Sequence, residues 1–277
     1  MDAKQKIKLR RTVRFLYDIQ ELRISTSNRG ASAHAELDKE DLAFLIEQSE
    51  KLKHIEKEIE KEVGHYLKGA PIWETWLKEQ RGIAFKLGGV ILSAFDIERA
   101  DTVSKMWRYA GLGVDAEGKA EARKKGVKLT YNPWLKGKMT KILGECLLRA
   151  NSPFRKFYDN YKHRKENTLV DVCMGCKGLG TLSITDDTEE EGVLIEEKKT
   201  KKKKKKAVKC ENCKGTGGPA PWGCSQKHRH NAAMRYMSKM FLQQLWEQWR
   251  RIEDLPVRPP YAEEFLNRVH HESTTVN

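Results

Sequence analysis

Two short runs of this sequence share the pattern C-x-x-C-x-G-x-G, one from Cys173 to Gly180 and the other from Cys210 to Gly217. Two thiolates at that spacing can bind one metal ion from a single tight turn, and the glycines behind them let backbone amides approach the sulfurs. Two such turns supply the four sulfurs of a closed tetrahedral site. The pattern therefore predicts one structural Zn²⁺ per chain; a pair of redox dithiols is the alternative. The predicted ligands are Cys173, Cys176, Cys210 and Cys213.

The duplicated run resembles a half-length version of the DnaJ-type zinc domain, which has four such repeats. The resemblance covers the two octapeptides only, and it implies a role in holding the chain together. Cys224 and His228 follow the second run and offer a substitute ligand or a second site, with a plain polar loop as the alternative. Cys146 lies on the apolar stripe of an expected helix, which predicts a buried core thiol.

The chain carries a net charge of +14 over 277 residues. Segment 168–224 holds 11 lysines and 9 acidic residues, so the other 220 residues carry a net charge of +12. Basic charge spread over the folded body favours a polyanionic partner, most often nucleic acid, because neutralised phosphates release counterions. Solubility alone is the alternative explanation of this charge.

The sequence predicts an intracellular protein with no membrane partner. No apolar run approaches the length that spans a bilayer, and the first residues lack the apolar core of a signal peptide. Four of the six cysteines have metal-ligand spacing, which suits a reducing compartment better than a disulfide scaffold.

Apolar periodicity predicts a mainly α-helical chain. Long helices are expected at Lys4–Ser27, 38–65, Lys136–Ala150 and Asn231–Ile252. In the second of these, apolar residues recur every seven positions, so this helix could pair with another copy of the chain or with a protein partner. The predicted fold is a helical bundle with a helix-hairpin-helix-like element and an inserted small zinc-binding module of strands and loops.

The same patterns divide the chain into four parts. Residues 1–70 form N-terminal helices, 71–167 a domain with the helix-hairpin-helix element, 168–224 the zinc module, and 225–277 a C-terminal helix that completes the second part. Within the module, residues 185–206 join an acidic block to a lysine run. Such a segment buries almost no apolar surface, which predicts a mobile loop.

The run Arg81-Gly82-Ile83, ahead of Gly88 and Gly89, resembles the turn of a helix-hairpin-helix element. Such a turn presents backbone N–H groups to a phosphate and binds nucleic acid without reading its bases. A basic tract follows at 119–141, in which Trp134 is a candidate for base stacking. The predicted nucleic-acid contacts are Arg81, Gly82, Ile83, Lys86, Gly88, Gly89, Lys124, Lys125, Lys136 and Lys138.

Three runs at Gly82–Ile97, Ser104–Leu112 and His230–Trp246 occur in an order that carries a family resemblance. With the zinc module inserted, this order resembles the C-terminal domain of the insertion-sequence transposases of the 110/116/902 group. The resemblance implies a DNA-recombinase fold that works with a guide RNA. Two departures argue against that chemistry: residues 1–69 leave no room for the family's RNase-H-like domain, and Glu117-Gly118 or Asp115 stands where the family has its catalytic serine.

The sequence thus favours a non-catalytic protein, related to a transposase domain, that binds duplex DNA through its backbone. One alternative is an active DNA recombinase or transposase component with a separate catalytic subunit. Another is a protein whose zinc module binds a protein partner, or which binds RNA.

Overall fold

The computed structural model of the chain describes residues 1–32, 39–114, 120–121, 125–185 and 205–259. Within these ranges the chain is mainly α-helical with short strands, which confirms the predicted fold class. None of the described helices is both long and apolar enough to cross a bilayer.

The chain forms two compact units. The first comprises 1–155 and 237–277, and the second comprises 156–236. The second unit is wider than the expected module 168–224, because it also includes most of helix α8 (Arg155–Asn167) and the beginning of helix α9 (Gln226–Ile252).

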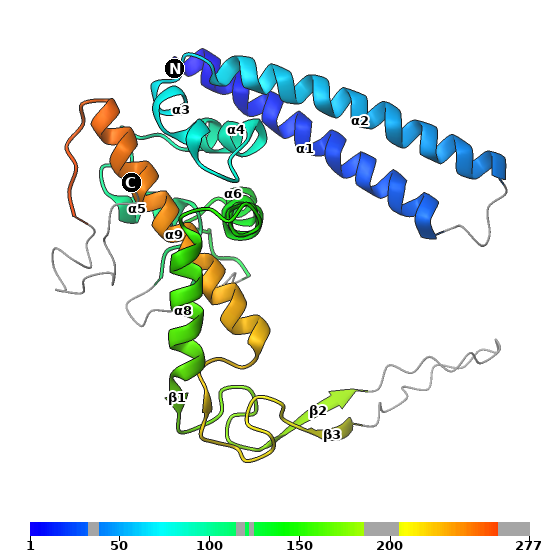
Figure 1. Cartoon of the computed structure of the whole chain (residues 1–277), viewed down its shortest axis with the longest axis vertical. Coiled ribbons are helices and arrows are strands. Elements are labelled where there is room, and N and C mark those ends of the chain that lie inside the picture. The colour runs from blue at the N-terminus through cyan, green and yellow to red at the C-terminus, as the bar shows by residue number, and fades with distance from the viewer. Residues whose placement is uncertain (33–38, 115–119, 122–124, 186–204, 260–277) are drawn as a thin grey trace. The chain divides into compact units, whose positions relative to one another are not determined.

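The helices α1 (Ala3–Ser32) and α2 (Lys39–Leu67) form an antiparallel hairpin in the first unit (Figure 1). Helix α1 buries Leu9, Val13 and Leu16 completely. These residues follow the spacing of three and four that places side chains on one face of a helix, as the sequence predicts.

A buried carboxylate, Glu56 of α2, joins three helices of the first unit. It accepts hydrogen bonds from Gln20 Nε2 at 2.8 Å and Arg23 Nε at 2.6 Å on α1, and from Lys86 Nζ at 2.5 Å. Lys86 belongs to α4 (Phe85–Ala94), which packs against both long helices. Burial opposes the charged form of the carboxylate, but the hydrogen bonds from Lys86 and Arg23 outweigh it and lower the pKa of Glu56.

Short helices complete the first unit. The segments α6 (Pro133–Gly137), the π-helical η2 (Lys138–Leu143) and α7 (Gly144–Arg149) follow one another without a break. The expected helix Lys136–Ala150 is therefore present and begins three residues earlier. One stripe of it is fully buried at Leu135, Met139, Leu143 and Leu147. The short elements are α3 (Pro71–Thr75), the 3₁₀ helix η1 (Leu77–Glu79), α5 (Val103–Tyr109), α6 (Pro133–Gly137), η2 (Lys138–Leu143) and α7 (Gly144–Arg149).

The described residues of the second unit form two small antiparallel sheets. Strand β1 (Leu169–Val170) pairs with β4 (Ala220–Pro221), and β2 (Thr181–Thr185) pairs with β3 (Lys205–Lys209). The ends of the expected loop 185–206 therefore belong to paired strands, because Thr185 lies opposite Lys205. Residues 186–204 of that loop lie outside the described residues.

We expect Glu56→Gln to lower the free energy of unfolding of the first unit by about 3 kcal/mol, because it leaves Arg23 without its buried counter-charge and Lys86 with Glu60 alone at 3.6 Å. The pKa of Glu56 is lower in the folded chain than in the unfolded one. The contribution of Glu56 to the free energy of unfolding is therefore present above its unfolded pKa, and it is lost as the pH falls through its folded pKa. In the Glu56→Gln variant, the free energy of unfolding should therefore fall less between neutral and acid pH than in the wild type. Urea titrations at both pH values would measure this difference.

Glu58→Gln is the matched control, since Glu58 lies on the same helix and its side chain is 63% exposed. We expect this control to change stability by about 0.5 kcal/mol or less. Equal losses in the two variants would contradict a special role for the buried carboxylate.

Candidate metal centre

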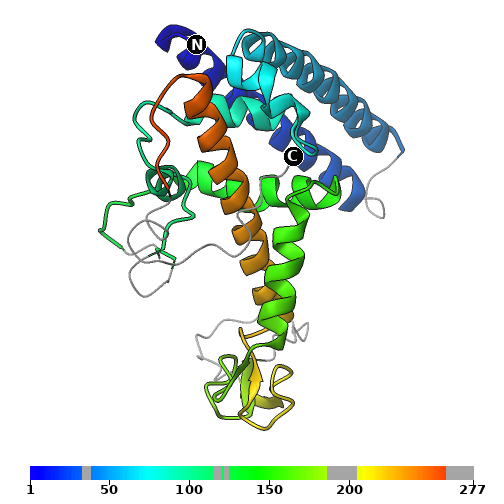
Figure 2. The same cartoon turned by 60° about the vertical axis from the view of Figure 1, so that its left-hand side comes forward.

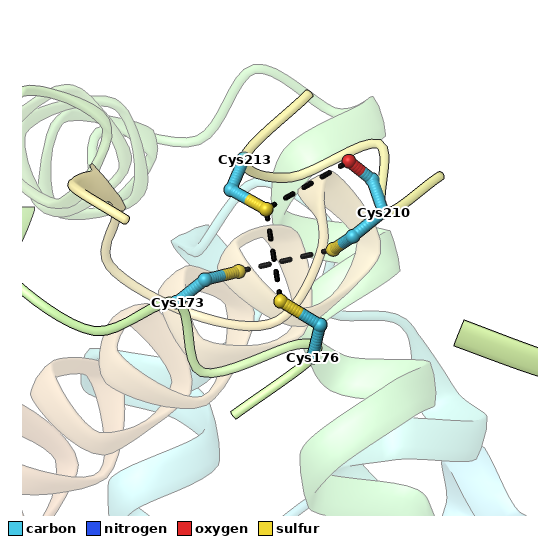
Figure 3. Close-up of side chains that lie close together, drawn as sticks. All are labelled: Cys173, Cys176, Cys210 and Cys213. Carbon is cyan, nitrogen blue, oxygen red and sulfur yellow. Dashed lines mark hydrogen bonds between the residues drawn. The ribbon is translucent and has the colours of Figure 1, made fainter. Parts of the chain in front are cut away.

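The side chains of Cys173, Cys176, Cys210 and Cys213 point toward one centre (Figure 3). All four are buried, and their sulfurs lie within 4.8 Å of one another. The Sγ–Sγ distance is 3.8 Å between Cys173 and Cys210 and 3.6 Å between Cys176 and Cys213. Sulfurs bound tetrahedrally at about 2.3 Å from an ion lie about 3.8 Å apart, so the four predicted ligands could hold one metal ion.

The glycines behind each cysteine pair bring the two turns into close contact. The amide of Gly180 donates to Cys176 Sγ at 3.2 Å, and that of Gly217 donates to Cys213 Sγ at 3.3 Å. A Cβ on Gly180 would lie 2.4 Å from the carbonyl oxygen of Gly215, and a Cβ on Gly217 would lie 2.3 Å from that of Gly178. No larger residue fits at Gly180 or Gly217 without moving the opposite turn.

Backbone hydrogen bonds also link each turn to the other. The amide of Cys173 donates to the carbonyl of Gly217, and the amide of Cys210 donates to the carbonyl of Gly180, both at 2.8 Å. The equivalent bonds run in both directions, so the two repeats bind each other as two similar halves. The duplicated octapeptide therefore determines both the candidate ligands and the contacts that align them.

Asn212 is a further residue of the candidate site, which the sequence pattern did not indicate. Its Nδ2 donates to Cys173 Sγ at 3.5 Å and to the carbonyl of Gly223 at 2.8 Å. Its Oδ1 accepts a hydrogen bond at 3.0 Å from Nη1 of Arg229, which is 7% exposed and lies on α9. Arg229 thus fixes the amide group that contacts a ligand sulfur. The first turn has Gly175 at the equivalent position, so the repeat pattern gave no signal for this pair.

The thiols of the cluster differ in how readily they lose a proton. The hydrogen bond from Asn212 lowers the pKa of Cys173 to about 6, whereas burial raises the pKa of Cys176 to about 11. A divalent cation would deprotonate all four groups, because thiolates are its ligands.

The other two cysteines lie outside this cluster. Cys224 Sγ is 3.1 Å from His228 Nδ1, and both residues are exposed. Among the described residues, only the four predicted cysteines bring three or more ligand groups together, so no third described ligand group joins this pair. Cys146 is half-buried on α7 and not fully buried as expected, and burial raises its pKa.

The helix-hairpin-helix-like turn forms between η1 and α4. Gly82 has a φ of 92° in this turn, Arg81 is exposed and Ile83 is buried. Arg81 is therefore on the surface, whereas Gly82 is half-buried against the backbone of Cys146 and the side chain of Ile83 belongs to the core.

Gly88 and Gly89 are buried, which corrects their assignment as phosphate contacts. A Cβ on Gly88 would lie 2.4 Å from Trp73, and a Cβ on Gly89 would lie 2.7 Å from Val63. These glycines let α4 pack closely in the core. Lys86 is also corrected, because it pairs with Glu56 inside the first unit and its charge is compensated there.

The basic tract is only partly described. Lys125 is exposed, whereas Lys124, Asp115 and Glu117-Gly118 lie outside the described residues. The ammonium of Lys136 lies 4.1 Å from the ring centre of Tyr131, so this cation is held within the tract itself.

A basic-aromatic cluster of Arg14, Tyr17, Trp134 and Lys138 joins α1 to α6 and η2. The ammonium of Lys138 lies 3.3 Å from the Tyr17 ring centre, and the Arg14 guanidinium lies 4.7 Å from that of Trp134. The Tyr17 and Trp134 rings meet edge to face at 5.8 Å. Trp134, the candidate for base stacking, is thus half-buried and already packed against Arg14. Burial lowers the pKa of Lys138.

No family model, curated protein or solved structure matches this chain. The resemblance to the transposase group therefore stays a prediction made from the residues. Function has to be argued from the cysteine cluster and the basic surfaces.

We expect the double variant Cys173→Ser, Cys210→Ser to lose stoichiometric metal, because each turn then offers a single thiolate. Elemental analysis of protein purified without chelator would measure the metal content. Cys224→Ser is the control, since it removes an exposed thiol outside the cluster and should keep the metal. A wild-type chain that contains no metal would contradict the assignment.

Asn212→Ala should weaken metal binding by about 10- to 100-fold, because outer groups that orient ligands contribute on this scale. Competition with a chromophoric chelator would measure the affinity. Glu211→Ala changes the exposed neighbour in the same turn and should leave the affinity unchanged. Similar affinities of the two variants would show that Asn212 does not act on the site.

Proposed function

We propose that this chain is a non-catalytic nucleic-acid-binding protein that contacts the backbone of duplex DNA, and that its cysteine cluster holds a structural Zn²⁺. The observation that carries the proposal is a set of cations on α1 and η2 that have no carboxylate within ion-pair distance among the described residues. Arg14 and Lys138 lie against aromatic rings. A cation held on a ring keeps its positive charge available to a phosphate, whereas one in an ion pair does not.

Exposed cations continue along the first turns of α1. Lys4, Lys8 and Arg11 are exposed, and within the described ranges none of them has an ion-pair partner. Ile7 lies between Lys4 and Lys8, and Phe15 follows Arg11 on the same helix; each side chain is 52% exposed. This basic face of α1 and the basic-aromatic cluster belong to the same unit, which supports one surface for a polyanion.

Because Glu56 compensates the charge of Lys86, we do not place the proposed surface at the hairpin turn. The exposed Arg81 can still contact a phosphate at that turn. The main contribution comes from Lys8, Arg11 and Arg14 of α1, which have no carboxylate within ion-pair distance among the described residues. Contacts of this kind bind the backbone and carry no base sequence information.

Zn²⁺ is the metal that suits the cluster best. Four thiolates in a tetrahedral arrangement are a typical set of ligands for structural zinc, and they leave no open position for a substrate. The metal would thus stabilise the second unit and take no part in a reaction.

The resemblance to a transposase domain supports DNA as the polyanion. The positions where that family has its serine hold acidic residues here, which supports a binding role without strand cleavage. A covalent protein–DNA adduct would support the active-recombinase alternative and overturn this part of the proposal.

We expect the double reversal Lys8→Glu, Arg11→Glu to weaken binding to every duplex about equally and by about tenfold or more. The slope of log affinity against log salt should become less steep by about 0.9 for each phosphate that the variant no longer neutralises. Fluorescence anisotropy with labelled duplexes over a salt series would measure both effects.

Lys57→Glu, Lys61→Glu is the matched control, because it changes the net charge equally on the neighbouring helix α2, where both lysines are exposed. This control should lose far less affinity. Equal losses would mean that only the overall charge matters, and tight binding by the α1 variant would place the interface elsewhere.

A further inference from the structure

The second unit has its own surface of aromatic and basic side chains, formed by Tyr161, Arg164, Lys165, Trp222 and Tyr236. We infer that this aromatic–basic surface binds an unpaired nucleic-acid strand, with bases stacked on the rings and phosphates paired with the cations. The inference rests on the proposed function in taking nucleic acid as the polyanion. It concerns different residues, in a different unit, and a different form of nucleic acid.

Two tyrosines form the first part of the surface. Tyr161 of α8 and Tyr236 of α9 stack with their ring centres 4.9 Å apart and their planes at 29°. Figure 2 shows α8 beside the beginning of α9, as this contact requires. Both residues are half-buried. The two rings cover each other's facing sides, so a base would stack on an outer face of the pair.

Lys165 connects this pair to a third ring. Its ammonium lies 4.5 Å from the ring centre of Trp222 and 5.9 Å from that of Tyr161. The guanidinium of Arg164 lies 5.4 Å from the Tyr161 ring. In the part of the chain that the structure describes, neither cation has a carboxylate within ion-pair distance.

The two adjacent cations favour an anion at this surface. Burial lowers the pKa of Lys165, and the neighbouring Arg164 charge lowers it further. A phosphate between them would offset both effects, since it supplies the missing counter-charge. Unpaired strands present such phosphates together with exposed base faces.

Thr168 and Arg229 hold the backbone of Trp222 in position. Its backbone N–H donates to the carbonyl of Thr168 at 2.9 Å, and its carbonyl accepts from Arg229 Nη1 at 3.4 Å. Arg229 also binds Asn212, which contacts a ligand sulfur. Through Asn212 and Arg229, the cysteine cluster would thus limit the motion of Trp222 before a strand binds, which lowers the entropy cost of binding.

Stacking is what distinguishes an unpaired strand from a duplex at this surface. In a duplex, base faces are covered by their neighbours, whereas each base that stacks on an aromatic side chain contributes about 1–3 kcal/mol. The surface on α1 has rings too, but Tyr17 is buried and Trp134 lies against Arg14 and Lys138, so we expect that surface to prefer the duplex backbone.

The test compares the full metal-loaded chain with its variants on two probes, a labelled oligothymidylate about 12 nucleotides long and a duplex of the same length. Arg164→Ala with Lys165→Ala, and separately Tyr161→Leu, should weaken oligothymidylate binding by about tenfold or more and leave duplex binding within about twofold. Tyr161→Phe keeps the ring and should bind like the wild type. Lys209→Ala with Lys214→Ala removes the same charge from exposed positions of the same unit and should have a small effect.

The outcomes separate the two proposals. If Tyr161→Leu and the Arg164/Lys165 variant bind the oligothymidylate as tightly as the wild type, this inference is wrong whatever happens with the duplex. If they lose that binding although the chain binds no duplex, the inference holds and the proposed function fails. Near-ultraviolet circular dichroism and metal content would show that the variants are folded, and an unfolded Tyr161→Leu would leave the Arg164/Lys165 variant to decide.

Discussion

The convergence of four buried thiols on one point takes the place of a hydrophobic core in the cysteine turns of the second unit. The buried cluster there consists of the four cysteines and Ala220, while neighbours such as Leu169 and Leu179 are 65% and 77% exposed. So few apolar atoms could not offset the chain entropy of ordering this segment. Binding of a metal ion would supply that free energy, and the position of Trp222 depends on the cluster through Asn212 and Arg229.

The first unit is stabilised by a buried charge in addition to its hydrophobic core. Glu56 is a buried charge that three side chains from α1 and α4 surround. Breaking such a group costs more than breaking an exposed ion pair, because the remaining charges stay buried without a partner. Arg250 acts in a related way near the end of α9, where it donates to the backbone carbonyls of Ile97, Ala100 and Pro256.

These internal contacts also decide which basic residues are available to bind a polyanion. Lys86 is used within the core, whereas Lys8 and Arg11 are exposed and Arg14 and Lys138 lie on aromatic rings. A net charge of +14 therefore says less about function than the distribution of carboxylates around each cation. In the second unit, Arg164 and Lys165 likewise lie near aromatic rings.

The sequence by itself determined the four candidate metal ligands and the main helices, because these depend on neighbouring residues. Cysteine spacing within one turn and apolar spacing along one helix are local properties, so Cys173 and Leu9 could be assigned from the pattern. Only the tertiary structure decided that Lys86 meets Glu56, that Gly88 packs against Trp73, and that Arg229 orients Asn212. Lys86 and Glu56 are 30 positions apart in the sequence. Contacts of this kind depend on how whole helices pack and not on any local pattern.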